Sequence, residues 1–354
     1  MFFNVQAERT IKVLAIGNSF STNAVEHNLY ELGEADNIKL IIGNLAIGGC
    51  SLSMHWYNAA KDAKLYSYLK INEYGDRTVT ESRSLYEAIV DENWDYITFQ
   101  QVSNLSGKYE TYFPYLSNLL NYVKNIATNP NVKYAFHSTW AYAQNTAHIG
   151  FANYNNDQMT MYNAIIDASF RAAKNAGIET VLPVSTAIQN GRTSVIGNNF
   201  CIDDGYHLNN YGQYIAACTW YEVLSGNNVV GNTFEPIRYH LEESYKEIFQ
   251  RVAHAAVVNP KEVTFEENML NFPSKEYSKV KITDGLLSIY VPEAEGANLR
   301  IELIALLGKS VVLFNGKSKS CELCCPLDNQ KGTILFLKIE VNNQLKEVKR
   351  LIMQ

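Results

Sequence analysis

The sequence of 354 residues lacks the features that mark membrane-spanning, nucleic-acid-binding and disulfide-rich proteins. No stretch reaches the ~18 consecutive apolar residues that a membrane span needs. Charged residues make up only 19% of the chain, the formal net charge is −6 and no basic run is present, which argues against a nucleic-acid partner. Six cysteines give little basis for a disulfide framework. We therefore expect a globular protein, and a hydrophobic content of 47% is ample for a sizeable core.

The cysteines and histidines do not form a metal-binding pattern either. The segment Cys321-Glu322-Leu323-Cys324-Cys325 has no partner cluster and no histidine nearby, so we reject a zinc site. Cys50 and Cys201 are expected at the same edge of the fold, either as a disulfide or, as we favour, as two buried thiols. His55 and His137 either line a pocket or satisfy structural roles. We predict no metal ion and no cofactor.

The strongest chemical signal is a serine in one motif and a histidine in another some 185 residues later. The short, β-branched run Ile11–Ile16 predicts a buried strand, and Gly17-Asn18-Ser19-Phe20-Ser21 follows it. A serine just past a strand end lies at the edge of the sheet where α/β folds place their chemistry. Asp204-Gly205-Tyr206-His207 supplies a base for the serine and a carboxylate that orients the base. The predicted catalytic residues are Ser19, Asp204 and His207.

Both motifs also permit purely structural roles. Asn18 and Ser19 are typical of turns and helix N-caps, and the second motif could be a turn before a helix that Asn209 caps. The α/β-hydrolase fold fits less well, because Ser21 stands where its motif requires glycine and Asp204 is too near the histidine. We favour the catalytic interpretation because the two motifs occur together and in order.

The order of motifs over roughly residues 9 to 258 resembles that of the SGNH (GDSL-type) serine hydrolases. The second block of that family has a glycine after the second strand; here the predicted strand Lys39–Gly43 is followed by Gly48 and Gly49. The third block has an asparagine after the third strand, and Asn104 stands there, although the glycine and aspartate around it are replaced by Val102 and Leu105. The resemblance therefore extends to three blocks of four.

The resemblance implies a flavodoxin-like three-layer α/β/α fold with a parallel sheet, and hydrolysis through an acyl-serine intermediate. It also implies an oxyanion hole formed by the N–H groups of Ser19 and Gly49 and the side-chain amide of Asn104, with Gln101 as an alternative amide donor. A well-placed donor is worth roughly 3–4 kcal/mol of barrier in such chemistry. The family includes carbohydrate acetylesterases, lipases, thioesterases and acyltransferases.

Strand and helix patterns alternate through this region, which predicts a parallel sheet with helices on both faces. Beyond the strands named, Tyr96–Gln100, Lys133–Thr139 and Thr180–Val184 have strand character. Helical patterns occupy Asn23–Ala35, Ser84–Val90, Tyr112–Ile126, Met159–Ala176, Tyr211–Leu224 and Leu241–Val258. The polar stretch Asn72–Glu81 is expected to be an irregular insertion near the site.

Three side chains are candidates to line the substrate site. Trp140 and Tyr142 follow the fourth strand and could stack on a sugar, and Arg192 could hold a polar substrate group. The alternative, that these residues pack loops together, is equally compatible with the sequence. The 23 tyrosines and the low charge also favour contact with carbohydrate, though weakly.

After Pro260 the helical patterns end and alternating apolar segments predict a small antiparallel β-sandwich over residues 262–354. The order of strand, Leu307-Gly308-Lys309 turn, strand and a closing segment with Lys346, Lys349 and Arg350 resembles the C-terminal sorting domain of type IX secretion. An ordinary accessory or carbohydrate-binding module is the alternative. Residues 1–8 read as a signal-peptide remnant or as a ragged N-terminus.

These observations favour an exported serine esterase, located in the periplasm, on the outer-membrane surface or outside the cell. Its expected substrate is a small-molecule or polysaccharide ester, and we favour an O-acetylated carbohydrate. An O-acetyltransferase that uses the same triad, and a glycan-binding protein built on an altered SGNH fold, are the alternatives. The sequence predicts no oligomeric state.

Overall fold

The computed structural model of the protein describes residues 9–265, 268, 279–283, 286–291, 294–305, 309–326, 334–342 and 344–352. The chain forms two compact units, Met1–Lys275 and Glu276–Gln354. The N-terminal segment 1–8 and most of the Leu307-Gly308-Lys309 turn, both used in the sequence analysis, lie outside the described residues.

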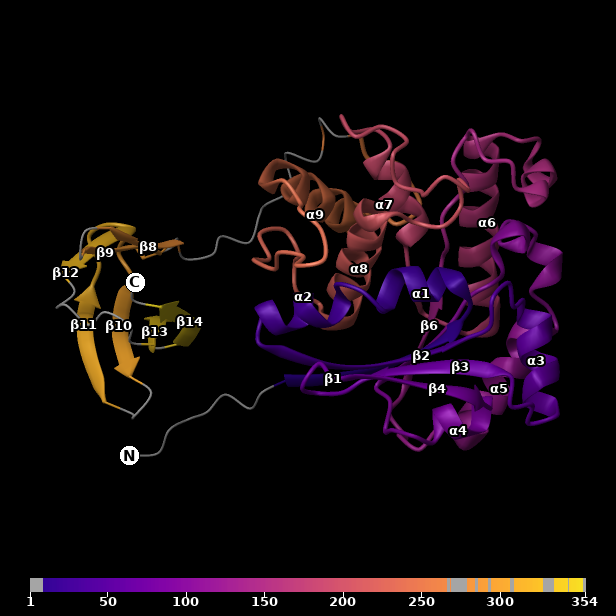
Figure 1. Ribbon diagram of the computed structural model, residues 1–354, viewed down its shortest axis with the longest axis horizontal. Coiled ribbons are helices and arrows are strands. Elements are labelled where there is room, and N and C mark those ends of the chain that lie inside the picture. Colours follow the sequence, from indigo (N-terminus) through magenta and orange to yellow (C-terminus); the bar gives the residue numbers. More distant parts are fainter. Residues whose placement is uncertain are drawn as a thin grey trace. The chain divides into compact units, whose positions relative to one another are not determined.

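A seven-stranded sheet forms the centre of the N-terminal unit, in the order β4-β3-β2-β1-β5-β6-β7 (Figure 1). Strands β1, β2, β5, β6 and β7 are parallel to one another, while β3 and β4 add an antiparallel edge. Their bounds are β1 Arg9–Gly17, β2 Ile38–Ala46, β3 Tyr66–Ile71, β4 Arg77–Arg83, β5 Tyr96–Phe99, β6 Lys133–His137 and β7 Thr180–Leu182.

Helices cover both faces of this sheet. Alternation along β1 sends Val13 and Ala15 into one core and Leu14 and Ile16 into the other. The first core packs against α1 Ser19–Val25, α2 Leu29–Ala35, α7 Val184–Gly191, α8 Asn210–Ser225 and α9 Glu243–Val258. The second packs against α3 Leu52–Ala60, α4 Leu85–Ile89 and α5 Tyr115–Ile126, and α6 Gln158–Ala176 contributes to both. The predicted three-layer α/β/α architecture is confirmed.

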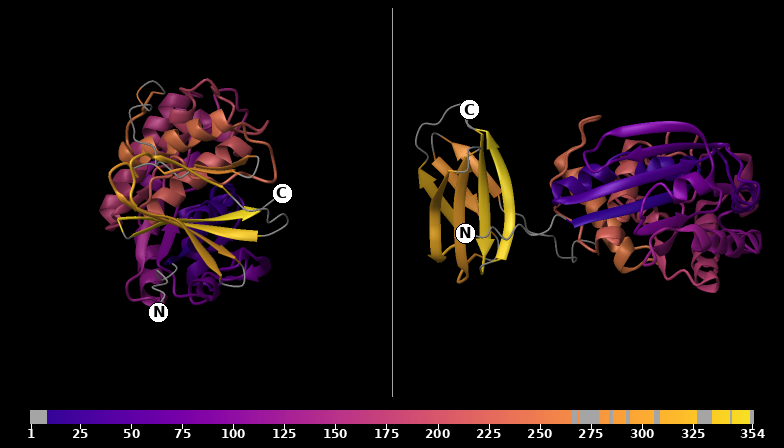
Figure 2. Two further views of the ribbon diagram at one scale, coloured as in Figure 1. Left: turned by 90° about the vertical axis from the view of Figure 1, so that its left-hand side faces the viewer. Right: turned by 90° about the horizontal axis from the view of Figure 1, so that it is seen from below.

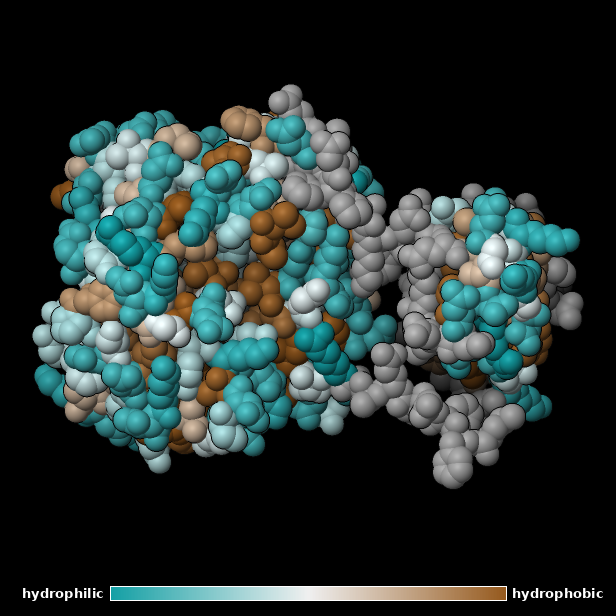
Figure 3. Space-filling view, turned by 180° about the vertical axis from the view of Figure 1, so that it is seen from behind, coloured by the Kyte–Doolittle hydropathy of each residue, from teal (hydrophilic) through white to brown (hydrophobic). Residues whose placement is uncertain are grey.

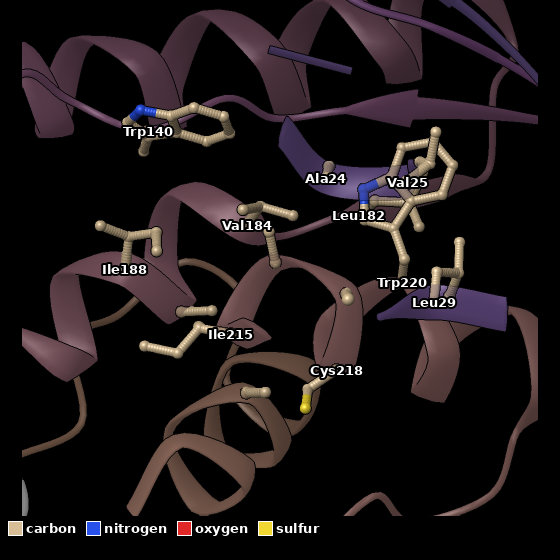
Figure 4. Close-up of a cluster of buried hydrophobic side chains, with 14 of the residues drawn as sticks. Ala24, Val25, Leu29, Trp140, Leu182, Val184, Ile188, Ile215, Cys218 and Trp220 are labelled. Atoms are coloured by element: carbon tan, nitrogen blue, oxygen red, sulfur yellow. The ribbon is translucent and has the colours of Figure 1, made fainter. Parts of the chain in front are cut away.

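The first core is rich in large side chains. Figure 4 shows part of it, with Trp220 of α8 near Leu182 and with Val184 between Trp220 and Trp140 in this view. Trp140 stacks on Phe20 with ring centroids 4.1 Å apart. This stack ties the first turn of α1 to the segment after β6, two of the segments that follow strand ends near the site.

Two local expectations are wrong. Asn72–Glu81, expected to be irregular, contains most of edge strand β4 and the turn before it, where the Asn72 side chain accepts hydrogen bonds from two backbone N–H groups. All but the last residue of β4 is exposed, so the strand carries no alternating apolar signal. The single helix expected over Asn23–Ala35 is divided by Asn28, which has a left-handed φ of 67°.

The C-terminal unit consists of two antiparallel sheets, which Figure 2 shows from two further directions. One has the order β11-β10-β13-β14 and the other β12-β9-β8. Apolar side chains of β9, β10 and β13, among them Ile289, Ile301 and Leu337, form one buried cluster, as expected for a β-sandwich. The bounds are β8 Lys279–Thr283, β9 Leu286–Tyr290, β10 Asn298–Ala305, β11 Ser310–Lys317, β12 Glu322–Pro326, β13 Ile334–Val341 and β14 Gln344–Ile352.

The surface of the N-terminal unit is mainly hydrophilic on the face shown in Figure 3, with apolar residues gathered near the middle of that face. Within the described part of the chain, no helix combines the length and apolar character that crossing a bilayer requires.

The contacts after α9 predict where the N-terminal unit can be cut. The Thr264 N–H donates to the Oδ1 of Asn190, a fully buried residue, at 2.8 Å, and Val263 packs on the first core. A chain that ends at Lys275 should keep the melting temperature of this unit. A chain that ends at Pro260 leaves the buried Asn190 oxygen unpaired, at a cost of about 1–3 kcal/mol, and should melt at least about 2 °C lower. Scanning calorimetry checks this, and equal melting temperatures would contradict it.

Candidate active site

The candidate site lies where three neighbouring strands end at one level. Gly17 of β1 pairs with Ala46 of β2, and Ile16 pairs with Phe99 of β5. The segments that follow these strands therefore begin side by side at one edge of the sheet. They carry the three expected blocks, at Ser19, at Gly49 and at Asn104.

A continuous hydrogen-bond chain joins the three predicted catalytic residues. His207 Nε2 lies 2.8 Å from Ser19 Oγ, and His207 Nδ1 lies 2.7 Å from Asp204 Oδ2. Ser19 is the first residue of α1, and all three side chains are partly exposed at the surface of the unit. The geometry is that of a nucleophile, a base and a carboxylate that orients the base.

The Asp204 carboxylate is held in place by the backbone of its own turn. Its Oδ1 accepts the N–H groups of Tyr206 and His207, each at 2.9 Å, which leaves Oδ2 for the imidazole. Burial raises the pKa of Asp204, but these two backbone hydrogen bonds and the interaction with His207 outweigh it, so that the pKa of Asp204 is lowered overall. A carboxylate of lowered pKa stays ionised and can stabilise an imidazolium beside it.

Asn18 connects the serine to the loop that carries Gly49. Its Oδ1 accepts the Phe20 N–H at 3.0 Å, which caps α1, and its Nδ2 donates to the Cys50 carbonyl at 3.0 Å. Gly49 has a φ of 66°, a conformation that favours glycine, and its N–H has no hydrogen-bond partner among the described residues. The cap role that the sequence offered as an alternative thus coexists with the catalytic arrangement.

The two amides proposed for the oxyanion hole have different surroundings. Gln101 is buried; its Oε1 accepts the Leu52 and Val102 N–H groups, and its Nε2 donates to Thr111. Its amide is therefore fully occupied in holding loops. Asn104 is half-buried, and its side-chain amide has no partner in the described part of the chain. Of the two, Asn104 has the amide that is available to a ligand.

A neutral hydrogen-bond network lies behind the serine. Gln100 donates from Nε2 to Asn18 Oδ1 at 2.7 Å, and its Oε1 lies 2.9 Å from His137 Nδ1. Burial lowers the pKa of His137 to about 3, so its imidazole is neutral. His137 therefore has a structural role, and so does His55, which is fully buried with its Nδ1 2.9 Å from the Tyr66 hydroxyl.

The three candidates for substrate contact are not available to a substrate. Trp140 and Tyr142 are both 0% exposed; the indole of Trp140 donates to the Tyr206 carbonyl and the Tyr142 hydroxyl bonds Ser103. Arg192 donates to Gln189 Oε1 and to the Ala141 carbonyl, so its guanidinium is engaged within the fold. The expectation that these side chains line the site is wrong, because the segment after β6 turns Trp140 and Tyr142 into the core and Arg192 is held by Gln189 and Ala141.

Different aromatic side chains border the triad. The half-buried ring of Tyr206 lies 4.3 Å from that of His207, and the His148 ring lies 4.7 Å from that of Tyr206. Neither residue was predicted from the sequence. The available signal was their position: Tyr206 lies within the Asp-x-x-His motif, and His148 lies in the same segment after β6 as Trp140.

The cysteines of the site are not joined to one another. Cys50 and Cys201 are free thiols, as favoured from the sequence. Burial raises the pKa of Cys50 to about 12, and burial likewise raises the pKa of Cys201. Both thiols are therefore protonated at neutral pH, and neither is an activated nucleophile.

The fold and the site define a three-layer α/β/α protein with a serine–histidine–aspartate arrangement at the ends of its parallel strands. Residues 12–256 match a family described as a domain of unknown function, DUF4886, to which the chain belongs. The crystal structure of a DUF4886 family protein from Bacteroides uniformis ATCC 8492 is 47% identical, with a TM-score of 0.70. That similarity covers 72% of this chain and 97% of the other.

Solved structures of esterases are similar at a much lower level. An acetylxylan esterase from Geobacillus stearothermophilus is 11% identical, covers 64% of this chain and 95% of its own, and has a TM-score of 0.40. A carbohydrate esterase family 3 protein from Talaromyces cellulolyticus is 13% identical, covers 61% of this chain and 97% of its own, and has a TM-score of 0.39. No curated protein matches the sequence.

The buried histidines predict acid sensitivity of the fold. Burial lowers the pKa of both His55 and His137 to about 3, from 6.5 for a free imidazole. Above pH 6.5 folded and unfolded chains are both neutral at these positions. Below it the unfolded chain binds protons that the folded chain does not, so the free energy of unfolding falls toward pH 3, by about 1.4 kcal/mol per pH unit for each histidine.

Urea unfolding at several pH values between 7 and 5 measures this slope. His55→Asn should reduce this slope by about 1.4 kcal/mol per pH unit, the contribution of one proton, because residue 55 no longer titrates. His240→Gln, at an exposed position, is the matched control and should leave the slope unchanged. An unchanged slope in His55→Asn would contradict the assignment of His55 as a buried neutral histidine.

Proposed function

We propose that the protein is a serine esterase that hydrolyses oxygen esters through an acyl-serine intermediate. The observation that carries this proposal is the unbroken hydrogen-bond chain from Ser19 Oγ through His207 to Asp204. Serine is a weak nucleophile without such a base, and a partly exposed triad has no evident structural purpose.

In the proposed reaction His207 Nε2 takes the proton of the Ser19 hydroxyl as Ser19 Oγ attacks the ester carbonyl carbon. The proton then passes from His207 to the departing alcohol oxygen as the ester C–O bond breaks, which leaves the acyl group on Ser19. A water molecule then attacks the acyl carbon as His207 takes one of its protons. His207 passes that proton to Ser19 Oγ as the bond between the acyl carbon and Ser19 Oγ breaks, which releases the acid and restores the Ser19 hydroxyl. Asp204 stabilises the imidazolium in both steps.

The negative charge that develops on the carbonyl oxygen requires hydrogen-bond donors at fixed positions. The Ser19 N–H is free of intrahelical bonds because Ser19 opens α1, and the Gly49 N–H is unpartnered among the described residues. The Asn104 amide is the third proposed donor. Gln101, the alternative raised by the sequence, is bonded to Thr111 instead.

We further propose an O-acetylated carbohydrate as the substrate, on the weak charge and the tyrosine content of the chain. An O-acetyltransferase could use the same triad with a sugar hydroxyl in place of water. The intact triad and the unpartnered Asn104 amide favour catalysis over a purely glycan-binding role, for which the altered third block was the only support.

We also propose that the protein is exported. The C-terminal unit is proposed to act as a sorting or accessory module, in line with the resemblance of its segments to a type IX sorting domain. A chain that ends at Lys275 tests this in the native cell. Loss of export with retained esterase activity supports a sorting role, and retained export with weaker turnover of polysaccharide supports a glycan-binding role.

Substitution of the triad tests the proposed function directly. Ser19→Ala should lower kcat/KM on p-nitrophenyl acetate by several orders of magnitude without unfolding the protein, because the triad acts as a unit. His207→Ala should lower it to a similar extent, and Asp204→Asn somewhat less, since the carboxylate only orients and stabilises the base. Circular dichroism and melting temperature confirm folding in each case.

Asp203→Asn is the matched control for Asp204→Asn. Asp203 is exposed and neighbours Asp204 in sequence, but in the described part of the chain it is Asp204 and not Asp203 that hydrogen-bonds His207, so the amide variant of Asp203 should retain near-normal activity. Near-normal turnover by Ser19→Ala would overturn the proposed function. A loss of activity in Asp203→Asn without a loss in Asp204→Asn would show that Asp203, and not Asp204, orients the histidine.

The oxyanion role of Asn104 gives a separate prediction. Asn104→Ala should lower kcat by about 10²–10³ with little change in KM, because the donor acts mainly on charge that develops in the transition state. Asn153→Ala is the control, since Asn153 contacts the same residue only through the Asn104 carbonyl, at 3.0 Å. Equal activities of the two variants in a p-nitrophenyl acetate assay would exclude a side-chain role for Asn104.

A further inference from the structure

A histidine outside the triad stands beside it. His148 lies in the segment between β6 and α6 and is half-buried. Its ring centroid is 4.7 Å from that of Tyr206, whose ring in turn lies 4.3 Å from that of His207. Tyr142 supports His148 from the core side, with ring centroids 4.8 Å apart. His148 and Tyr206 therefore form one wall next to the catalytic base.

The tautomer of His148 is fixed by its own loop. The Gly150 N–H donates to His148 Nδ1 at 3.0 Å, so Nδ1 is the acceptor and a neutral ring carries its hydrogen on Nε2. Burial lowers the pKa of His148, Asp204 raises it and His207 lowers it further; the net direction is downward, toward the neutral ring. No partner for Nε2 exists among the described residues, so its N–H is an unused donor.

Gly150 brings His148 close to the proposed oxyanion donor. A Cβ atom at position 150 would lie 2.4 Å from the Asn104 Cβ and 3.1 Å from His148 Nδ1, so only glycine fits between them. The residue thus separates two side chains that each have an unused N–H donor. Asn104 is the candidate for the acyl oxygen. His148, on the Tyr206 and His207 side, is adjacent to the base that protonates the departing alcohol.

We propose that His148 binds a hydroxyl group on the alcohol part of the ester through its Nε2–H, so that the site selects polyhydroxylated alcohols such as sugars. The inference rests on the proposed esterase function and names the residue that would select its substrate. A half-buried aromatic ring and a hydrogen-bond donor side by side match the two faces of a sugar, its apolar C–H face and its hydroxyl rim. His148 is a specificity residue in this scheme, and the triad carries the chemistry.

Two substitutions separate the two nitrogens of His148. In His148→Asn the side-chain oxygen lies near the former Nδ1 and can still accept the Gly150 N–H, but no donor reaches as far as Nε2. In His148→Gln the terminal amide reaches the position of Nε2 and restores a donor. The substrates are methyl glucopyranoside carrying one O-acetyl group and cyclohexyl acetate, whose alcohol has a six-membered ring without hydroxyl groups.

We expect the His148→Asn variant to lose activity only on the acetylated glucoside. His148→Asn should lower kcat/KM on the acetylated glucoside about tenfold, mostly through KM, since a neutral hydrogen bond is worth about that factor. It should leave kcat/KM on cyclohexyl acetate and on p-nitrophenyl acetate unchanged, and the melting temperature as well. His148→Gln should recover most of the activity that His148→Asn loses on the glucoside. If His148→Asn lowered kcat/KM equally on the acetylated glucoside and on cyclohexyl acetate, or on neither, the proposed role of His148 would be overturned while the esterase proposal would stand. A wild-type protein inactive on all three esters would overturn both.

Discussion

The arrangement at the site depends on the side chain of Asn18. One amide group caps the helix that begins with Ser19, donates to the Cys50 carbonyl in the Gly49 loop and accepts from Gln100. Three strands end at this edge, and the hydrogen bonds of Asn18 add to those that already join the segments after them, such as the Leu52 N–H to Gln101 Oε1. Asn18 is 2% exposed, so each of these hydrogen bonds is protected from competition by water. Asn18 therefore connects the segment that carries Ser19 directly to the loop that carries Gly49.

An amide is the group that these contacts require. The Cys50 carbonyl needs a donor, while the Phe20 N–H and the Gln100 amide need an acceptor, and asparagine offers both ends at once. An ionised carboxylate at position 18 would face the Cys50 carbonyl with a second acceptor and would be buried without a counterion. The sequence of the first motif is thus matched to a backbone carbonyl 32 residues further along the chain.

Much of the fold could be predicted from the sequence because local signals were strong. The run Ile11–Ile16 is a buried strand, and Asn209 caps α8 through its side chain, as its position before an apolar helix suggested. Local sequence patterns failed to predict the secondary structure where contacts between distant parts of the chain determine it. The residues of β4 pair at an exposed edge without alternation, and Asn28 interrupts a helical pattern by adopting a left-handed conformation. The short helix α3, Leu52–Ala60, follows the Gly49 loop and was not expected at all.

The site shows the same division between local and tertiary information. Ser19, Asp204 and His207 were identifiable because each motif places its residues by short-range geometry, and Asp204 reaches His207 within one turn. The wall beside them was not identifiable, since Trp140 and His148 belong to one segment and sequence does not say which of them turns inward. The indole of Trp140 stacks on Phe20 in the core, whereas His148 is half-buried beside Tyr206.

The electrostatics of the site follow from these packing choices. The groups behind Ser19 are two amides and an imidazole that burial keeps neutral, so the network that positions the nucleophile adds no charge of its own. Asp204 is then the charged group in hydrogen-bond contact with His207. Its charge would favour the imidazolium of the proposed reaction, and the described network of Asn18, Gln100 and His137 contains no charged group that opposes it. The neutral network of Asn18, Gln100 and His137 therefore holds the geometry of the site, while the Asp204 carboxylate supplies the charge beside His207.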